Sequence, residues 1–536
     1  MPQKKLADKQ GVAALTALAV HGSATRASLA LNLPRSTFMS RIREARRLKL
    51  SADASALGDP VPDGELPRSR VYVITCAQDD APVHAGFLAS LQHYCAARKA
   101  LLVVIPYTYQ QAYAASRNKT GLDNWAPELK NFMYAGRANL NNNLQLLADV
   151  RVLPTASRPL ASFESLSGPK SSIVGHPSIA LASVATPHNR LPKLLVTTGA
   201  VTRPRYTNTR AGKIGEFHHV FGAVVVELQS SKIFHLRHIN AVSDGSFTDL
   251  AWHATPHGIK RAPRAEAVVL GDQHVAVADK QVVRATFGPG GIIPTLSPRH
   301  VVWHDTLDFY AANHHHRNDP FLKLAKRRAG RDSVEDEVRE ACAFLQKYAP
   351  KNALSILVAS NHDEAFDRWL RETDWRQDMV NAEFYLETAM AVARSAKLKD
   401  CRGEALSPFH HWLRRLLPSN MIRRMRLLER NGSFLIRGIE VGMHGDRGAN
   451  GARGSLASFR RIGRKTVIGH SHSPGINGGA YQVGTSSGLH LDYNAGLSSW
   501  LHCHCVIYAN GKRTLIPIID GSWRLVAQGG GRHAKK

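Results

Sequence analysis

Five apolar runs in the second half of the chain lead directly into residue types that ligate metal ions, and this feature restricts the fold most. The runs are residues 266–270, 300–303, 354–359, 434–441 and 466–468. Each has the length of a buried strand, and helical stretches between them, the longest at 320–348, can serve as crossovers. Parallel strands deliver their C-terminal ends to one sheet edge, so we expect the residues that follow to converge there.

The residues after these runs are carboxylates, imidazoles and one amide, which suit a two-metal site for hard or borderline divalent ions. The candidate ligands are Asp272, His274, Asp305, Asn361, His444, His470 and His472. A carboxylate such as Asp305 can bridge two ions that lie ~3.5–4 Å apart, activate a hydroxide and neutralise charge on an attacked phosphorus. His410 and His411 also lie between the motifs, but His444 is preferred because it ends an apolar run.

The order Asp-x-His, Asp, Asn-His-Asp, His and Gly-His-Ser-His over residues 262–520 resembles that of the calcineurin-like metallophosphoesterases. The resemblance implies one metal on Asp272, His274, Asp305 and His472, and another on Asp305, Asn361, His444 and His470. It also implies that His362 protonates the leaving oxygen or stabilises the transition state, with Asp363 orienting it. The expected ions are Mn²⁺, with Mg²⁺, Fe or Zn²⁺ as alternatives.

Two positions depart from the pattern of that family. His304 precedes the bridging Asp and Ser360 precedes the Asn, where the family usually has glycine. Both departures affect backbone geometry rather than the ligands themselves.

The first 50 residues predict a small DNA-binding module. Helices are expected at 12–21, 26–31 and 38–48, with Phe38, Ile42 and Ala45 facing inward and a basic face outward. The pattern resembles a helix-turn-helix of the winged-helix type. The candidate nucleic-acid contacts are Arg35, Ser36, Thr37, Arg41, Arg43, Arg46 and Arg47. The alternative is a small helical bundle whose basic face is only solvated.

The remaining chain divides by composition. We expect a linker at 51–69, an α/β domain with a parallel sheet at 70–245, the catalytic domain at 262–525 and a flexible basic tail at 526–536. The expected class is α/β: a metallophosphoesterase β-sandwich flanked by helices, preceded by a second α/β domain and the winged-helix-type module. Residues 71–109 and 198–219 are similar to a bacteriophage branch of the family that is associated with DNA degradation and host takeover.

The charge balance points to a polyanionic partner. The chain has 70 Lys and Arg against 42 Asp and Glu, a formal charge of +28, and such a field favours a polyphosphate chain. A solubility charge or an acidic membrane surface is the alternative. Six scattered cysteines fit a reducing cytosol, and no apolar run approaches the ~20 residues of a membrane span. We therefore expect a cytoplasmic protein, in the host cytoplasm if it is phage-encoded.

Two functions of different classes follow. The first is a metal-dependent phosphodiesterase or nuclease, above all a DNase. The second is a DNA-binding regulator whose phosphoesterase domain is a platform or acts on a small nucleotide. A phosphomonoesterase is a weaker third option, since a small substrate needs no charge of +28. The sequence does not decide between DNA and RNA as the substrate or between endonuclease and exonuclease action. It also leaves open whether the chain forms a homo-oligomer.

Overall fold

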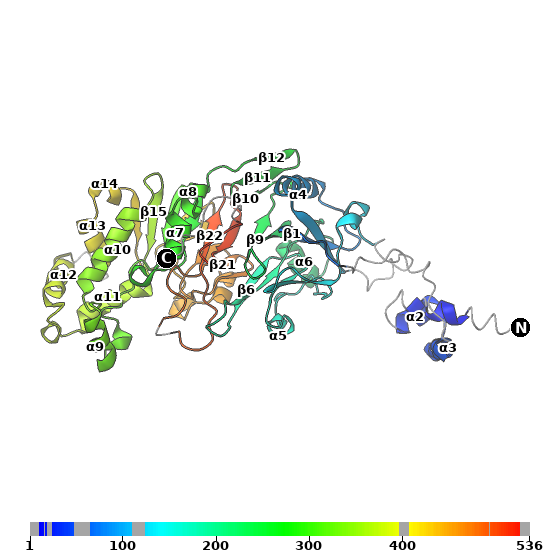
Figure 1. The fold of residues 1–536 in the computed structure, drawn as a ribbon, viewed down its shortest axis with the longest axis horizontal. Coiled ribbons are helices and arrows are strands. Elements are labelled where there is room, and N and C mark those ends of the chain that lie inside the picture. Colours follow the sequence, from blue (N-terminus) through cyan, green and yellow to red (C-terminus); the bar gives the residue numbers. More distant parts are fainter. Residues whose placement is uncertain are drawn as a thin grey trace, which may run out of the picture.

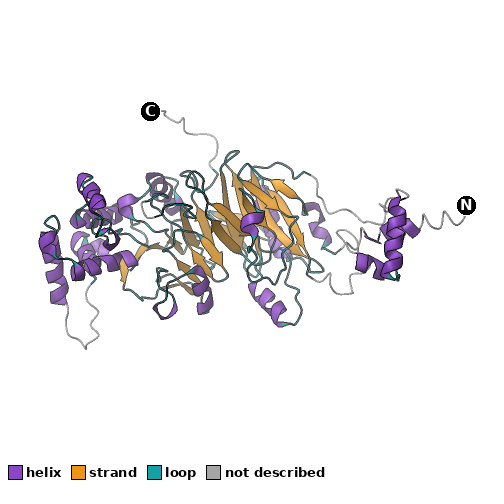
Figure 2. Cartoon of the chain, turned by 90° about the horizontal axis from the view of Figure 1, so that it is seen from below, coloured by secondary structure: helices purple, strands orange, loops and turns teal. Residues whose placement is uncertain are grey.

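The computed structural model describes residues 10–15, 17–18, 24–47, 65–109, 124–395, 407–491 and 494–525. It is a mixed α/β protein whose strands form two large sheets and two small ones (Figures 1 and 2). The predicted α/β class is confirmed at this level. The predicted linker at 51–69 is described only from residue 65, and the tail at 526–536 lies outside the described residues.

A four-stranded sheet in the order β2-β1-β8-β9 begins the main body. Its strands are β1 (Val71–Gln78), β2 (Leu101–Tyr107), β8 (Gly222–Leu228) and β9 (Phe234–Asn240). The helix α4 (Ala85–Arg98) connects β1 to the parallel strand β2, as predicted. However, β8 is antiparallel to both β1 and β9, so this sheet is mixed rather than parallel as expected. The connection at 229–233 is too short for a crossover and permits only an antiparallel pair.

A six-stranded sheet carries the first three predicted metal-ligand strands, in the order β16-β15-β14-β13-β22-β23. Its strands are β13 (Ala267–Val269), β14 (His300–Trp303), β15 (Leu354–Val358), β16 (Met425–Leu428), β22 (Cys503–Ile507) and β23 (Arg513–Pro517). The strands from β13 to β16 are parallel, as the strand–helix–strand pattern predicts.

Helices fill the connections between these parallel strands and gather at one end of the molecule (Figures 1 and 2). They are α7 (Lys280–Phe287), α8 (Ile292–Leu296), α9 (Pro320–Arg328), α10 (Val334–Tyr348), α11 (Asn361–Glu372), α12 (Ala382–Ser395), α13 (Pro408–Leu416) and α14 (Ser419–Ile422). The predicted helical stretch 320–348 is two helices, because Gly330, two residues after the end of α9, adopts φ +62°.

A ten-stranded sheet joins the two halves of the chain, in the order β17-β18-β19-β21-β20-β6-β7-β5-β4-β3. Its strands are β3 (Arg137–Asn139), β4 (Leu144–Leu147), β5 (Ser171–Val174), β6 (Ala180–Val184), β7 (Lys193–Thr197), β17 (Leu435–Ile436), β18 (Ile439–Glu440), β19 (Thr466–Ile468), β20 (Gly475–Asn477) and β21 (Ala480–Gln482). Because β6 pairs with β20, the expected boundary at 245–262 does not separate independent units. One hydrophobic core contains residues from both segments, among them Ile74 and Val467.

Residues 434–441, expected to form one strand, form the hairpin β17–β18 instead. Arg437 and Gly438 have φ of 51° and 74°, which suits the two-residue turn of a hairpin. A small sheet of β10 (Phe247–Asp249), β11 (Trp252–Thr255) and β12 (Gly258–Arg261) lies between the predicted domains in sequence.

The N-terminal module has its own small core. It contains α2 (Ala24–Ala30) and α3 (Arg35–Arg47), and residues 10–15 and 17–18 are also helical. Phe38, Ile42 and Ala27 form a core cluster separate from the others, as the helical spacing predicts. The described residues of this module include no strand, so a wing is not seen among them.

Candidate metal centre

The predicted ligands lie where the ends of the two large sheets meet. Asp272 and Asp305 follow β13 and β14, and Asn361 begins α11 after β15, all in the six-stranded sheet. His444 follows β18, and His470 and His472 follow β19, in the ten-stranded sheet. The ligands therefore converge from two sheets, rather than from one sheet edge as expected.

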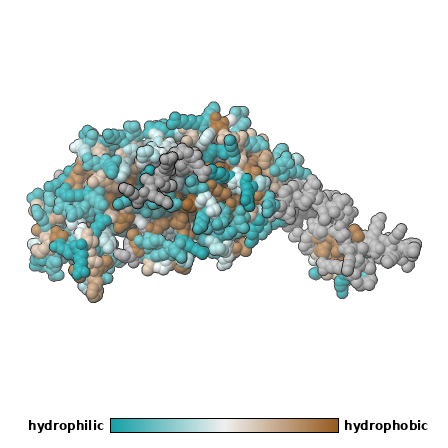
Figure 3. All heavy atoms as spheres, viewed as in Figure 1, coloured by the Kyte–Doolittle hydropathy of each residue, from teal (hydrophilic) through white to brown (hydrophobic). Residues whose placement is uncertain are grey.

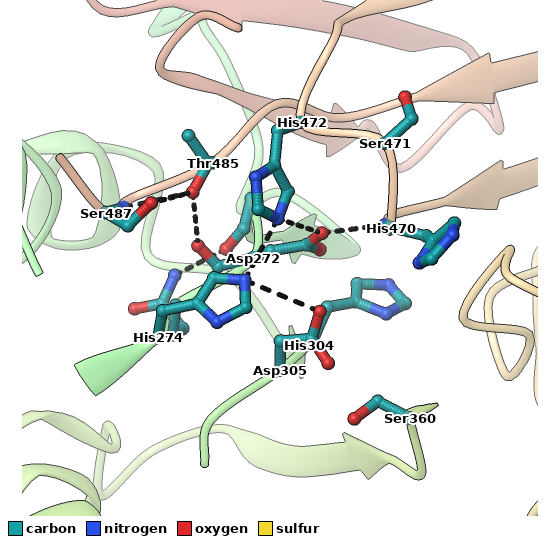
Figure 4. A network of polar contacts seen from close by, with 12 residues as sticks. Asp272, His274, His304, Asp305, Ser360, His470, Ser471, His472, Thr485 and Ser487 are labelled. Atoms are coloured by element: carbon teal, nitrogen blue, oxygen red, sulfur yellow. Dashed lines mark hydrogen bonds and ion pairs between the residues drawn. The ribbon is translucent and has the colours of Figure 1, made fainter. Parts of the chain in front are cut away.

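Four of them form a buried cluster: Asp272, His274, Asp305 and His472 place one ligand atom each within 4.8 Å of the others. The Nε2 atom of His472 is 3.2 Å from Asp272 Oδ2 and 2.9 Å from His274 Nε2. His274 Nε2 is in turn 3.6 Å from Asp305 Oδ2. Figure 4 shows His472 reaching down from its loop toward Asp272 and His274. These are the four residues that the family resemblance assigns to one ion.

A second group adjoins this cluster through Asp305. His444 Nε2 lies 3.2 Å from Asp305 Oδ2, and the rings of His444 and His470 have centroids 5.4 Å apart. Asn361 occupies the first position of α11, and its Oδ1 atom is buried without a hydrogen-bond partner. Asp305 thus faces imidazoles of both groups, which is the position that a bridging carboxylate requires.

The donor set fits divalent cations. Asp272 Oδ1, Asp305 Oδ1 and Asn361 Oδ1 are buried acceptors without hydrogen-bond partners. Burying such atoms without compensation is costly, and a cation held by Asp272 and Asp305 would satisfy the two carboxylate oxygens. Gly469 preserves the necessary space, since a Cβ atom there would lie 2.2 Å from Asp272 Oδ1.

Protons partly neutralise the carboxylates of the site. Burial by itself lowers the pKa of His274. A hydrogen bond to Asp308 and the charges of nearby carboxylates outweigh burial and raise this pKa to about 9. His444 is likewise raised to a pKa of about 9, with Asp305 outweighing the effect of burial. Burial raises the pKa of Asp305, but His444 and His362 bring it well below its ordinary range. Binding of a metal must therefore displace protons.

The backbone at the site is held in an unfavourable region. His274, Asp305, His470 and His472 have φ of 39°, 44°, 76° and 59°, a region that costs non-glycine residues on the order of 1 kcal/mol or more each. Hydrogen bonds hold this geometry: His274 N–H donates to the Asp305 carbonyl, and His470 N–H donates to Asp272 Oδ2, both at 2.7 Å. Such strain is common at functional sites.

His362 lies beside the cluster, as predicted, but Asp363 does not orient it. His362 Nδ1 donates to the Asp308 carbonyl at 2.5 Å, and its ring centroid is 4.7 Å from that of His274. The Asp363 carboxylate instead accepts from Ser360 N–H at 2.8 Å in the capping box of α11. The expected role of Asp363 was therefore wrong, since this carboxylate caps a helix. The same cap explains Ser360, whose hydroxyl accepts from two N–H groups of the first turn.

Asp308 and His304 contact candidate ligands, and neither contact was predicted from the sequence. Asp308 Oδ1 accepts from His274 Nδ1 at 2.7 Å, which leaves Nε2 of that ring facing the cluster. The Nδ1 atoms of His304 and His444 are 3.3 Å apart, so one ring can donate to the other. The position of Asp308, three residues after Asp305, was the sequence feature that could have indicated its place at the site. For His304 the sequence offered only the departure from glycine.

The predicted nucleic-acid contacts lie on α3. Arg35, Ser36, Thr37 and Arg43 are exposed and Arg41 is partly buried, whereas the side chains of Arg46 and Arg47 lie outside the described residues. Ser36 and Thr37 fall inside the first turn of this helix, because it begins at Arg35 rather than at the expected Phe38. Their contact with DNA stays a prediction.

Comparison with known proteins gives one informative similarity. No family model matches the sequence, and no solved structure matches it. Protein A1 of Escherichia phage T5 is 31% identical over 483 residues, which cover 88% of this chain and 85% of that protein. At this identity and coverage, the chain belongs to the family of phage T5 Protein A1.

Proposed function

We propose that the chain is a metal-dependent phosphodiesterase that hydrolyses DNA. The observation that carries the proposal is the buried cluster of Asp272, His274, Asp305 and His472, whose ligand atoms lie within 4.8 Å of one another. Its extension through Asp305 to His444 supports a pair of sites that share one carboxylate. Hard-to-borderline ions such as Mn²⁺ suit these oxygen and nitrogen ligands.

The residues around the cluster suit hydrolysis of a phosphoester. Two divalent ions, when bound, would lower the pKa of a water molecule and neutralise charge on the attacked phosphate. Asp308 holds His274 through Nδ1 and receives His362 Nδ1–H at its backbone carbonyl. His362 keeps 17% of its side chain exposed, so a proton on Nε2 can pass to the leaving oxygen of a substrate.

A cavity beside His444 offers room for the groups that flank the reacting phosphate. It has a volume of about 260 Å³, and its lining includes His444, Arg430, Arg447 and Phe459. Mostly apolar walls with a few polar groups are typical of ligand sites. A sugar or base next to the phosphate is therefore the substrate part that we assign to this cavity.

The charge of the chain supports a polymeric substrate. The formal charge is +28, and the face shown in Figure 3 is largely hydrophilic between smaller apolar groups. Among the described residues, no helix is both long enough and apolar enough to cross a bilayer. The T5 relative supports a phage-encoded protein, and action on DNA in the host cytoplasm is part of our proposal.

Plasmid cleavage tests the proposal directly. Purified protein is incubated with supercoiled plasmid and, separately, with a chromogenic phosphodiester, each with Mn²⁺, Mg²⁺ or EDTA. We expect nicked or linear plasmid and diester hydrolysis with Mn²⁺, and neither with EDTA or with Asp305→Ala. A matched control, Asp149→Asn, changes an exposed carboxylate paired with Arg137 and should keep full activity.

The second candidate is a DNA-binding regulator, which the exposed basic residues of α3 support. It predicts tight duplex binding without plasmid cleavage under any metal condition. Cleavage of the plasmid that depends on Mn²⁺ and on Asp305 would exclude this alternative.

A further inference from the structure

A basic residue precedes each parallel strand of the six-stranded sheet, at the edge opposite to the metal centre. The strands β13, β14, β15 and β16 run in parallel, and the first three of them lead at their C-terminal ends into candidate ligands. Their N-terminal ends therefore lie at the other edge of the sheet. The basic residues that precede them are Arg264, Arg299, Lys351, Arg423 and Arg424. We call these five residues the basic edge.

The basic edge surrounds a large hollow. A cavity of about 650 Å³ lies between the end of α10, α14 and the start of β15, elements that Figure 1 labels. Arg264, Lys351 and Arg424 line it together with Lys347. An adjoining cavity of about 360 Å³ adds Arg299 and Arg423. Neither lining contains an aspartate or a glutamate.

Two of these positive charges, on Arg264 and Arg424, are fixed in place but not neutralised. The Arg264 guanidinium donates to the carbonyls of Ser297, Pro298 and Asn352. Arg424 donates in the same way to the carbonyls of Asn420 and Lys351. Carbonyl groups are neutral, so both guanidinium groups keep their whole charge while their side chains are held.

The structure pairs none of these cations with a carboxylate. Across the described part of the chain, no Asp or Glu lies within ion-pair distance of the five residues of the basic edge or of Lys347. The carboxylate closest in sequence, Glu266, is already paired with Arg437 at 3.0 Å. An anion from outside the chain is therefore the partner that this surface lacks.

We propose that the basic edge binds the phosphate backbone of a nucleic-acid strand, as a second contact site on the face away from the metal centre. Neighbouring strands lie ~4.8 Å apart, so the three intervals between four strands span about 14 Å. That length corresponds to about four nucleotide steps of one DNA strand at ~3.4 Å of axial rise each. Arginine and lysine are the usual partners of such phosphates, and these contacts are independent of base sequence.

Binding at the basic edge does not depend on hydrolysis at the metal centre. Contacts at two faces with one polymer raise the effective local concentration of the polymer at the metal centre. The edge would therefore retain the protein on DNA between cleavage events. Binding can be measured in EDTA, where no metal-dependent reaction proceeds.

The test uses a triple variant of the full-length protein, Arg299→Gln, Lys351→Gln and Arg423→Gln. These three side chains are exposed and form no hydrogen bond or ion pair with any described residue, so their loss should not disturb the fold. Duplex binding is followed by fluorescence anisotropy in EDTA over a range of salt. The slope of log K against log salt should fall by about 2–3, because each lost phosphate contact removes about 0.9 released counterion.

A matched triple variant controls for the loss of net charge. Arg158→Gln, Lys232→Gln and Lys260→Gln removes three exposed cations from other surfaces, and its slope should stay within about one of the wild-type value. Both triple variants should melt at the wild-type temperature and hydrolyse a chromogenic diester at the wild-type rate. An equal fall of the slope in both variants, or no fall in either, would overturn the proposal.

Two further measurements separate other occupants of the basic edge. ATP binding is measured by equilibrium dialysis. If the first triple variant no longer binds ATP but keeps the wild-type slope of log K against log salt for DNA, the edge binds free nucleotides. Sedimentation gives the oligomeric state of the same proteins. If the first triple variant changes its oligomeric state but keeps the wild-type slope of log K against log salt for DNA, the edge joins two copies of the chain. Either result overturns the assignment to a nucleic-acid backbone.

Discussion

Replacing Asp308 by asparagine tests how the site prepares His274 for a metal ion. The Asp308 carboxylate accepts from His274 Nδ1 at 2.7 Å, which fixes the ring and directs Nε2 toward Asp305 and His472. Asparagine has nearly the same shape and can still accept, but it lacks the negative charge. We expect a loss of metal affinity on the order of 10–100-fold, the usual effect of removing a partner that orients a ligand.

The size of this loss should depend on pH. The Asp308 hydrogen bond is the largest influence that raises the His274 pKa, which lies at about 9. At pH 7 a proton on His274 competes with the metal, and the competition ends as the pH rises through 9. Asp308→Asn lowers this pKa and therefore weakens proton competition at pH 7. The net loss of affinity should be smaller at pH 7 and reach its full value at pH 9.

Titration calorimetry with Mn²⁺ at pH 7, 8 and 9 measures both effects. Asp149→Asn serves as the control, because this carboxylate is exposed and contacts Arg137; its affinity should match the wild type at each pH. If Asp308→Asn bound Mn²⁺ as tightly as the wild type at pH 9, or lost the same factor at every pH, the role given to Asp308 would be wrong.

Three further predictions concern catalysis and DNA binding. His362→Ala should keep its metal content by elemental analysis yet lose plasmid cleavage by ~10²–10⁴-fold, with a smaller loss on substrates that have good leaving groups. Asp305→Ala should lose metal and activity together, because it removes the carboxylate shared by both groups; an unchanged metal content would contradict the bridging role. Arg43→Ala combined with Arg46→Ala and Arg47→Ala should weaken duplex binding and flatten its salt dependence by about one unit per lost contact, while hydrolysis of a chromogenic diester survives. Equal loss of both activities would mean that residues 1–50 belong to the catalytic fold.

The strands that lead to the candidate ligands could be predicted because local pattern determines them. The runs at 266–270, 300–303 and 354–359 are mostly apolar stretches, and each became a largely buried parallel strand. The residue types that follow them define a donor set without any knowledge of tertiary structure. The cluster of Asp272, His274, Asp305 and His472 was therefore predictable from the sequence.

Contacts between distant segments could not be predicted in this way. The pairing of β6 with β20 joins residues nearly 300 positions apart, and no local periodicity encodes such a partner. The role of Asp363 was misjudged for a related reason, since a carboxylate at the third position of a helix can cap it or face a neighbour. Only the capping hydrogen bonds with Ser360 distinguish the two.

Anomalous X-ray diffraction from crystals grown with Mn²⁺ tests the central claim most directly. We expect two anomalous peaks ~3.5–4 Å apart that share Asp305, with His274 beside one and His444 beside the other. The same crystals of Asp305→Ala should show neither peak at full occupancy. A wild-type crystal with a single peak away from Asp305, or with no peak at this cluster, would contradict a two-metal phosphodiesterase.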